Sequence, residues 1–246
     1  MSDTAAIILA AGKGIRMNSD LPKVYHSICG KPLIAWVVEA VQKAGSGGNV
    51  YVVVGYKAEL VKEACEKYQV NFVEQKEQLG TGHAVMQVGS LLKDLTGTTV
   101  VLNGDVPLIK PKTIKDLVAF HEKMGSAATV LTADLDDPGA YGRIVRDGSG
   151  GLVRIIEKKD AGKDELAVKE INTGTYCFNN QDLFNALPKL KSDNAQKEYY
   201  LTDVIGILKS SGRTVCAFKA ADATEVLGVN TKEDLLHLEE LCKRGV

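Results

Sequence analysis

The first residues whose types could bind a ligand or catalyse a reaction form a turn of glycines and cations near the N-terminus. An apolar run at residues 5–10 (AAIILA) ends in residues 11–17 (AGKGIRM), and Lys23 follows six residues later in residues 21–24 (LPKV). Small residues allow a ligand to lie against the backbone. Two opposite charges in contact attract by about 4 kcal/mol at a surface-like dielectric, so cations here suit a polyphosphate. Arg16 and Lys23 therefore indicate a nucleotide-binding turn.

This turn matches neither common phosphate-binding fingerprint. A dinucleotide fingerprint needs a third glycine where Met17 stands, which disfavours an NAD(P)-dependent oxidoreductase. A P-loop needs Gly-Lys before Ser or Thr, but Gly14 and Ile15 follow Lys13. From this segment alone, a tight turn without a ligand and two solvated loop charges stay open as alternatives.

A second candidate is the acid that follows a buried strand. Residues 100–102 (VVL) run into Asn103, Gly104 and Asp105. Ligands of open α/β sheets bind beyond the carboxyl ends of the strands, and a carboxylate there can hold Mg²⁺ together with substrate phosphates. An Asx turn before Pro107 is the alternative. Polar residues beside glycine recur at 80–83 (GTGH), 173–174 (TG) and 228–230 (GVN), where turns and helix caps explain each one singly.

The elements that position these residues alternate between strand and helix in the first half of the chain. The apolar pattern predicts strands at 5–10, 50–54, 70–74, 98–102 and 127–133, and helices at 32–44, 58–68, 80–92 and 112–124. Pro32 is expected at the first position of its helix and Gly45 as its stop. Helices between strands predict βαβ units and a doubly wound, mostly parallel sheet of the Rossmann-like α/β class.

The second half begins with a β-rich insertion. Strands are predicted at 142–146, 152–157 and 168–178, with a turn at 147–151 (DGSGG). Helices are predicted at 181–187 and 202–211, and a late strand at 214–220. Residues 231–234 (TKED) resemble a capping box that opens a last helix.

Composition limits the classes of function. The 246 residues carry a formal net charge of −1, which argues against a nucleic-acid binder. The five cysteines have no CxxC pair and are expected to be free thiols in a reducing cytoplasm. No apolar run has the length of a membrane span, and no basic segment of the signal-peptide kind precedes the first strand. The four histidines lack metal-ligand spacing and are interpreted as surface or core residues.

Taken together, the segments resemble the sugar-1-phosphate nucleotidyltransferases, and in particular the uridylyltransferase domains of bacterial N-acetylglucosamine-1-phosphate uridyltransferases. Eight motifs carry the resemblance in order: 9–17 (LAAGKGIRM), 21–24 (LPKV), 78–84 (QLGTGHA), 104–108 (GDVPL), 141–144 (YGRI), 170–174 (EINTG), 198–203 (EYYLTD) and 228–230 (GVN). They extend over nearly the whole chain. The resemblance implies Mg²⁺-dependent transfer of UMP from UTP to N-acetylglucosamine 1-phosphate, with release of pyrophosphate.

The resemblance also implies roles by position. Arg16 and Lys23 would neutralise the triphosphate, and Asp105 and Asn230 would bind Mg²⁺. The uracil and ribose would lie against Leu9, Ala10, Ala11, Gly12, Gln75, Gly80 and Thr81. The amino sugar would be held by Asn103, Gly104, Gly142, Glu157, Asn172 and Thr202.

Two positions and one missing segment depart from the family pattern. Asn103 stands where Tyr is frequent, so a phenol contact to the sugar is in doubt, and Ile15 stands where Thr or Ser is common. Residues 1–246 are expected to be one nucleotidyltransferase domain. The hexapeptide repeats of a left-handed β-helix acetyltransferase are absent from this sequence, so no acetyl transfer is expected. The family's trimer contacts lie mostly in that missing part, so a monomer is expected.

Three other functions stay open. A nucleotidyltransferase for glucose 1-phosphate, or for another nucleoside triphosphate, would keep the fold and change the substrates. A sensor of nucleotide sugars would bind without releasing pyrophosphate, although it would not need both cations and both metal ligands. An NAD(P)-dependent oxidoreductase is the third.

Overall fold

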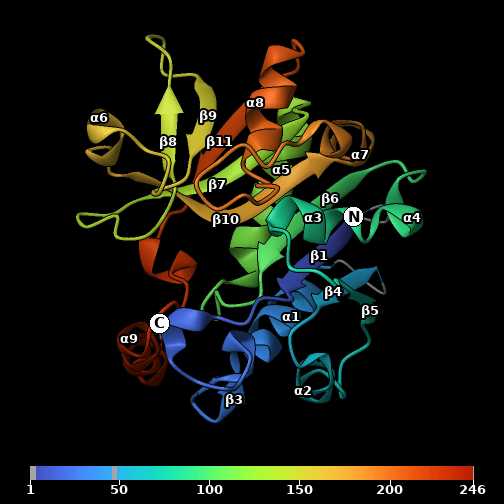
Figure 1. Cartoon of the computed structure of the whole chain (residues 1–246), viewed down its shortest axis with the longest axis vertical. Helices are drawn as coiled ribbons and strands as arrows, with labels where there is room; N and C mark the ends of the chain where they lie inside the picture. Colours follow the sequence, from blue (N-terminus) through green and yellow to red (C-terminus); the bar gives the residue numbers. More distant parts are fainter. Residues whose placement is uncertain (1–3, 46–48, 246) are drawn as a thin grey trace.

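A twisted central sheet forms the middle layer of the protein (Figure 1). The computed structural model describes residues 4–45 and 49–245. Neighbouring strands follow the order β11-β7-β10-β6-β1-β4-β5. Their bounds are β1 Thr4–Ala10, β4 Val50–Val54, β5 Asn71–Glu74, β6 Thr98–Asn103, β7 Ala128–Asp134, β10 Glu170–Asn179 and β11 Val215–Lys219.

The sheet is largely parallel, as the strand-helix alternation predicts. β1 pairs in parallel with β4 and β6, β4 with β5, and β11 with β7. Strand β10 pairs antiparallel with both β6 and β7, so it runs against the other strands of the central order. Because β10 lies between β6 and β7, the β-rich insertion is joined to the middle of the sheet.

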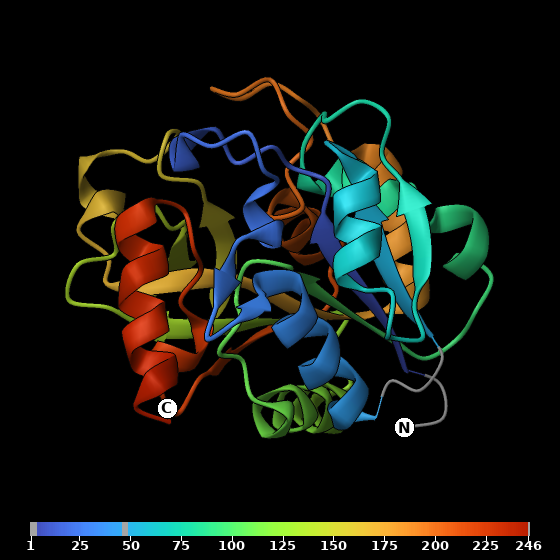
Figure 2. The same ribbon diagram turned by 90° about the horizontal axis from the view of Figure 1, so that it is seen from below.

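Helices cover both faces of the sheet, which explains why its inner strands are continuous apolar runs. Helices α1 (Leu33–Ala44) and α5 (Pro111–Met124) pack side by side on one face with α2 (Ala58–Ala64) near them (Figure 2). The other face carries α3 (Thr81–Met86), α4 (Gly89–Leu92), α7 (Asn180–Ala186) and α8 (Asp203–Ser210). The doubly wound α/β architecture is therefore confirmed.

The insertion contains a hairpin, β8–β9, that precedes β10 in the chain and extends the sheet beside it. Strand β8 (Arg143–Arg146) pairs antiparallel with β9 (Leu152–Ile156) and touches β10 at Ile171. The predicted turn between β8 and β9 closes with a hydrogen bond from Asp147 N to Gly151 O of 2.9 Å. A short helix, α6 (Lys163–Leu166), follows the hairpin and was not predicted.

A smaller apolar cluster holds the last helix against the N-terminal part of the chain. Met17, Ile28, Leu33, Val229 and Leu238 are buried in it. Helix α9 (Lys232–Lys243) begins with the predicted capping box, as Thr231 Oγ1 accepts from Asp234 N at 3.2 Å and Asp234 Oδ2 accepts from Thr231 N at 2.9 Å. Its neighbour is a small hairpin, β2 (Ser27–Ile28) and β3 (Lys31–Pro32), that the sequence did not predict. Four single 3₁₀ turns complete the described elements: η1 Ile15–Met17, η2 Lys23–Tyr25, η3 Leu187–Lys189 and η4 Ala223–Val226.

Two helix predictions were wrong in extent by more than one residue at an end, and a third was wrong about its first residue. The helix expected at 80–92 is divided into α3 and α4, because the chain tightens between them to hydrogen bonds such as Val88 N to Val85 O. The helix expected at 58–68 ends at Ala64 and is followed by turns. Pro32 belongs to β3 and caps α1, whose first helical residue is Leu33.

Candidate functional site

The carboxyl ends of β1, β4 and β6 bring the first predicted segments together. Leu9 O accepts from Gly104 N at 2.9 Å, and Ala11 O accepts from Tyr56 N at 3.0 Å. A Cβ on Gly104 would lie 2.8 Å from Ile34 Cδ1, so glycine allows this close approach. The side chain of Ala10 is buried in the core and offers a ligand only its backbone.

The two glycines of the turn after β1 serve different purposes. Gly14 has a φ of +73°, and a Cβ on it would lie 2.5 Å from Lys23 Cβ, so a side chain would push these segments apart. A Cβ on Gly12 would meet nothing within 4 Å. Gly14 thus allows the turn to pack closely against Lys23, while Gly12 faces open space that a ligand can enter.

Two cations and two oxygen ligands converge next to this turn. The Lys23 ammonium forms an ion pair with Asp105 Oδ2 and donates to Asn230 Oδ1 at 3.4 Å. Arg16 Nη2 donates to the same Asn230 oxygen at 2.7 Å. The sequence-predicted phosphate and metal residues therefore form one group, which we call the charge cluster, although they come from three distant segments.

The segment that carries Asn230 is held by contacts from both halves of the protein. Gly228 N donates to Tyr141 Oη at 2.8 Å, and Val229 N donates to Asp105 O at 3.0 Å. Asp234 Oδ2, at the start of α9, accepts from Asn230 N at 2.8 Å. Burial raises the pKa of Tyr141 to about 12, so its hydroxyl stays protonated at neutral pH.

The predicted base-binding residues after β5 and at the start of α3 are held by a set of close contacts. Gln75 is buried, and its Nε2 contacts Gly80 O at 3.1 Å and His83 Nδ1 at 3.0 Å. Thr81 Oγ1 accepts from Leu201 N at 3.0 Å. A Cβ on Gly80 would lie 2.7 Å from Tyr199 O, so the turn before α3 packs closely on the segment before α8.

The predicted sugar-binding residues come together around β9 and β10. Asn172 N donates to Gly142 O at 2.9 Å, and Asn172 Nδ2 donates to Tyr176 Oη at 2.8 Å. Glu157 Oε1 accepts from Thr202 Oγ1 at 3.3 Å. Burial, aided by the neighbouring carboxylates, raises the pKa of Glu157 despite that hydrogen bond.

Asn103 lies where β6 faces the irregular part of β10. A Cβ on Gly174, which has a φ of +78°, would lie 2.1 Å from Asn103 Nδ2. The amide of Asn103 therefore occupies the space that a side chain at residue 174 would need. This close approach places Asn103 next to β10 and the predicted sugar-binding residues. Asp105, which belongs to the charge cluster, follows two residues later in the sequence.

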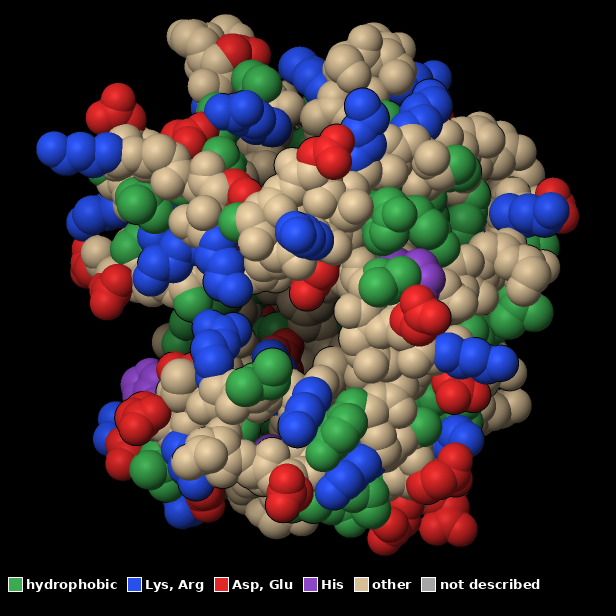
Figure 3. Space-filling model, in the orientation of Figure 1, with side chains coloured by type: hydrophobic (Ala, Val, Ile, Leu, Met, Phe, Trp, Pro, Cys, Tyr) green, Lys and Arg blue, Asp and Glu red, His purple; other side chains and the backbone are tan. Residues whose placement is uncertain are grey.

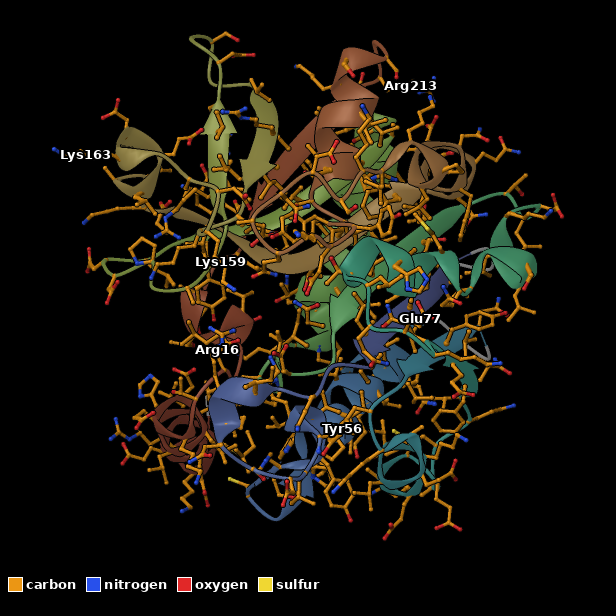
Figure 4. The ribbon with its side chains drawn as sticks, viewed as in Figure 1. Arg16, Tyr56, Glu77, Lys159, Lys163 and Arg213 are labelled. Atoms are coloured by element: carbon orange, nitrogen blue, oxygen red, sulfur yellow. The ribbon has the colours of Figure 1, made fainter. Side chains whose placement is uncertain are left out.

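The surface is hollowed between the segments predicted to bind the nucleotide and those predicted to bind the sugar. Figure 3 shows a recess near the centre of this face, with lysine and arginine side chains on its left border. Figure 4 places Arg16 and Lys159 at that border, Arg16 from the turn after β1 and Lys159 from the turn after β9. The recess is thus bordered by residues from both halves.

Sequence reasoning missed Tyr141 as a contact of the Asn230 segment and Lys159 as a border residue. Tyr141 lies in a motif quoted for the family resemblance, but nothing local signals that its hydroxyl meets Gly228, 87 residues away. Lys159 lies in a run of charged residues, KKD at 158–160, that reads as a solvated turn.

Comparison with solved structures identifies the fold class. The protein superposes on the crystal structure of a UDP-glucose pyrophosphorylase complexed with UDP-glucose with a TM-score of 0.78, over 100% of both chains and at 19% sequence identity. At this identity the likeness concerns the fold alone. Within the described residues, no helix combines the length and apolarity needed to cross a membrane.

Sequence comparison identifies the family. The family model of the MobA-like NTP transferase domain matches residues 6–203, and the chain belongs to this family. Proteins named bifunctional protein GlmU are similar over its full length: that of Shouchella clausii is 49% identical over 246 residues, covering 100% of this chain and 54% of the relative. That of Streptococcus mutans is 50% identical over 241 residues, covering 98% and 52%. The chain spans about half the length of these curated relatives.

Proposed function

We propose that residues 1–246 act as one nucleotidyltransferase domain that transfers UMP from UTP to N-acetylglucosamine 1-phosphate and releases pyrophosphate. The family membership and the similarity to proteins named GlmU support a nucleotidyltransferase. The motif resemblance described above supports the choice of substrates. We further propose that the protein works in the cytoplasm, a reducing compartment that suits its free cysteines.

The charge cluster is the observation that carries this proposal. Two cations beside an open glycine turn can bind the phosphates of a nucleotide, and both come from the carboxyl-end side of the sheet where ligands of this architecture bind. A binding protein without catalysis would not need Asp105 and Asn230 to meet at the same lysine.

The chemistry of the donor set fits Mg²⁺. Asp105 and Asn230 supply a carboxylate and an amide oxygen that reach one ammonium group, so they also reach one small cation between them. Mg²⁺ is usually held by one or two protein oxygens together with substrate phosphates and water. Bound there, it would neutralise charge on the triphosphate. Lys23 would then lose its two oxygen partners and be available to phosphate.

The reaction needs little chemistry from side chains. A phosphate oxygen of the sugar phosphate attacks the α-phosphorus of UTP, the α–β bridging bond breaks, and pyrophosphate leaves. The attacking monoester is already an anion, so no general base is required. Arg16 and Lys23 stabilise the charge that develops on the phosphates, and the glycine turn orients the nucleotide.

The buried polar residues on the sugar side are suited to a neutral, hydroxyl-rich ligand. Thr202 and Asn172 are buried, and half-buried Glu157, whose pKa is raised, accepts a hydrogen bond from Thr202. A carboxylate, a hydroxyl and an amide can exchange their mutual hydrogen bonds for bonds to sugar hydroxyls and an N-acetyl group. We propose that Asn103 and Gly104 complete this side.

A substrate panel tests the proposal. Pyrophosphate release is measured for UTP, ATP, CTP and GTP, each with N-acetylglucosamine 1-phosphate or glucose 1-phosphate, with Mg²⁺ and with excess chelator. We expect the highest kcat/KM for UTP with N-acetylglucosamine 1-phosphate, and no release without Mg²⁺. Formation of the nucleotide sugar is confirmed by mass spectrometry.

The other outcomes separate the alternatives. A preference for glucose 1-phosphate or another nucleotide would keep the reaction and replace the substrates. Binding of UTP without pyrophosphate from any pair would identify a sensor and overturn the proposal. Unchanged turnover in excess chelator would overturn the assignment of Mg²⁺.

A further inference from the structure

A cysteine occupies a backbone position that does not favour it. Cys29 and Gly30 form the two-residue turn between β2 and β3, with φ angles of +48° and +74°. Positive φ at both positions is the requirement of a type I′ turn, where Asn-Gly and Gly-Gly are preferred. A non-glycine residue in this left-handed region costs about 1–2 kcal/mol. A strained residue of this kind points to a role beyond the turn itself.

The thiol of Cys29 lies beside the C-terminal half of α9. Its Sγ is 3.9 Å from the backbone oxygen of Glu239, and Cys242 follows one helical turn later on the same face. The Cys29 thiol is also one of the groups that raise the pKa of Cys242, as expected of neighbouring thiols. Cys29 is exposed and Cys242 is partly buried against the cluster of Met17, Ile28 and Leu238. Figure 2 shows α9 beside the segment that carries the hairpin.

We propose that Cys29 and Cys242 form a reversible disulfide that fastens the last helix to the β2–β3 hairpin. Cys29 lies six residues after Lys23, and α9 begins two residues after Asn230. The bond would therefore tie together the two segments that carry Lys23 and Asn230. This inference rests on the thiol geometry and is independent of the proposed function.

The other three cysteines are not placed for this chemistry. Cys65 and Cys177 are fully buried, and burial raises the pKa of each thiol, so both are protected from a polar oxidant. Cys216 is partly exposed on β11. It offers a matched control for a thiol that can be reached by solvent.

A low-molecular-weight disulfide such as oxidised glutathione can drive the reaction by exchange. The thiolate of exposed Cys29 attacks one reagent sulfur, a mixed disulfide forms, and one reagent thiolate leaves. Cys242 loses its proton to water and attacks Cys29 Sγ, which forms the intramolecular bond and releases the second reagent thiol. Two protein thiols lose two electrons in total, and one reagent disulfide becomes two thiols.

The second step is the slower one at neutral pH. Burial, followed by the Cys29 thiol, raises the pKa of Cys242 to about 11, against the opposing effect of the Lys31 ammonium. Only a small fraction of Cys242 is then thiolate at neutral pH. The position of Cys29 Sγ beside the Glu239 oxygen, one helical turn before Cys242, offsets this by keeping the two thiols near each other.

The test uses the full chain with oxidised glutathione. Intact mass and non-reducing peptide maps are recorded for the wild type and for Cys29→Ser, Cys242→Ser and Cys216→Ser. We expect the wild type and Cys216→Ser to lose the mass of two hydrogen atoms and to yield a linked peptide containing Cys29 and Cys242. Cys242→Ser should instead keep glutathione on Cys29. A reducing agent should restore the starting mass.

Thermal unfolding supplies a second readout. The oxidised wild type should have a Tm roughly 5–10 °C above the reduced form, because the bond closes a long loop. Oxidised Cys242→Ser should show no such rise, although all reduced variants unfold at a Tm close to the wild type's. A mixed disulfide that persists on Cys29 of the wild type, or a linked peptide that contains Cys216, would overturn the proposal.

Discussion

Lys23 places one ammonium group between an acid that follows β6 and an amide that precedes α9. Its ion pair with Asp105 and its contact with Asn230 join segments 125 residues apart in the sequence. A hydrogen bond to a charged group contributes about 1.5–3 kcal/mol, so these contacts hold the site in shape before any ligand arrives. Arg16 adds a second cation to the same amide oxygen.

Removal of either cation should impair catalysis and leave the fold intact. We expect Lys23→Ala and Arg16→Ala each to lower kcat for pyrophosphate release by about 10²–10³, the usual effect of losing one charge stabiliser. Asp105→Ala should cause a comparable loss. Initial rates and circular dichroism measure the two properties separately.

Lys13 offers a matched control for these variants. It belongs to the same turn, but its ammonium lies 5.3 Å from the ring centre of Tyr56 and is not part of the charge cluster. Lys13→Ala should retain a kcat within a few-fold of the wild type. If Lys13→Ala lowered kcat as much as Lys23→Ala does, the total charge of the turn, and not the charge cluster, would support catalysis.

Tyr141 connects the insertion to the Asn230 segment through one hydrogen bond. We expect Tyr141→Phe to raise the KM for Mg²⁺ several-fold, because Gly228 N would lose its acceptor and the segment would be less firmly held. The Tm should fall by about 2–4 °C. Rates measured over a range of Mg²⁺ concentrations give the KM.

Tyr56→Phe is the control for Tyr141→Phe. The hydroxyl of Tyr56 donates to Asp20 O at 3.2 Å in an exposed loop, so its loss should leave the KM for Mg²⁺ unchanged. An unchanged KM in Tyr141→Phe as well would contradict the positioning role of Tyr141.

At the scale of elements, α5 packs on the sheet through a buried histidine. His121 is 3% exposed, and its Nδ1 lies 2.9 Å from Thr129 Oγ1 of β7. Burial lowers its pKa from 6.5 to about 4. The unfolded chain therefore binds more protons than the folded one between these values, so this histidine's contribution to stability is complete above pH 6.5 and is lost as the pH falls towards 4.

His121→Gln should make folding stability less sensitive to acid. The free energy of unfolding of the wild type relative to the variant should fall by about 3 kcal/mol between pH 7 and pH 4, the linkage expected for a shift of this size. Urea unfolding at several pH values measures it. The control is His237→Gln, because His237 is exposed and its replacement should leave the pH dependence of the free energy of unfolding unchanged. A wild-type-like pH dependence in His121→Gln would contradict the argument.

The order and type of most elements could be predicted from the sequence, because an apolar strand or helix face is a local pattern. Helix α1 shows this in its buried stripe, and the capping box of α9 in four consecutive residues. The break between α3 and α4 and the β2–β3 hairpin could not be predicted. The first is a local change of hydrogen bonding around Val85 and Val88, and the second has only two residues in each strand.

At the scale of the whole molecule, the described part of the surface gives little reason for self-association. The exposed apolar side chains include Leu236 on α9, Leu91 on α4 and Met124 on α5, which stand on separate elements. Apolar residues scattered singly are normal for a monomer. Sedimentation equilibrium should therefore give a monomer's mass at every concentration, and a mass that rises to that of a dimer or trimer would contradict this expectation.

The doubly wound α/β class, the glycine turn after the first strand, and the residues of the charge cluster could all be predicted from the sequence. These follow from local patterns and from motifs that keep their order along the chain. That Lys23 stands between Asp105 and Asn230, that Tyr141 holds the Asn230 segment, and that Cys29 lies beside α9 becomes evident from the folded structure. Contacts between such distant residues depend on which strands become neighbours and on how helices pack, and no short-range pattern carries that information.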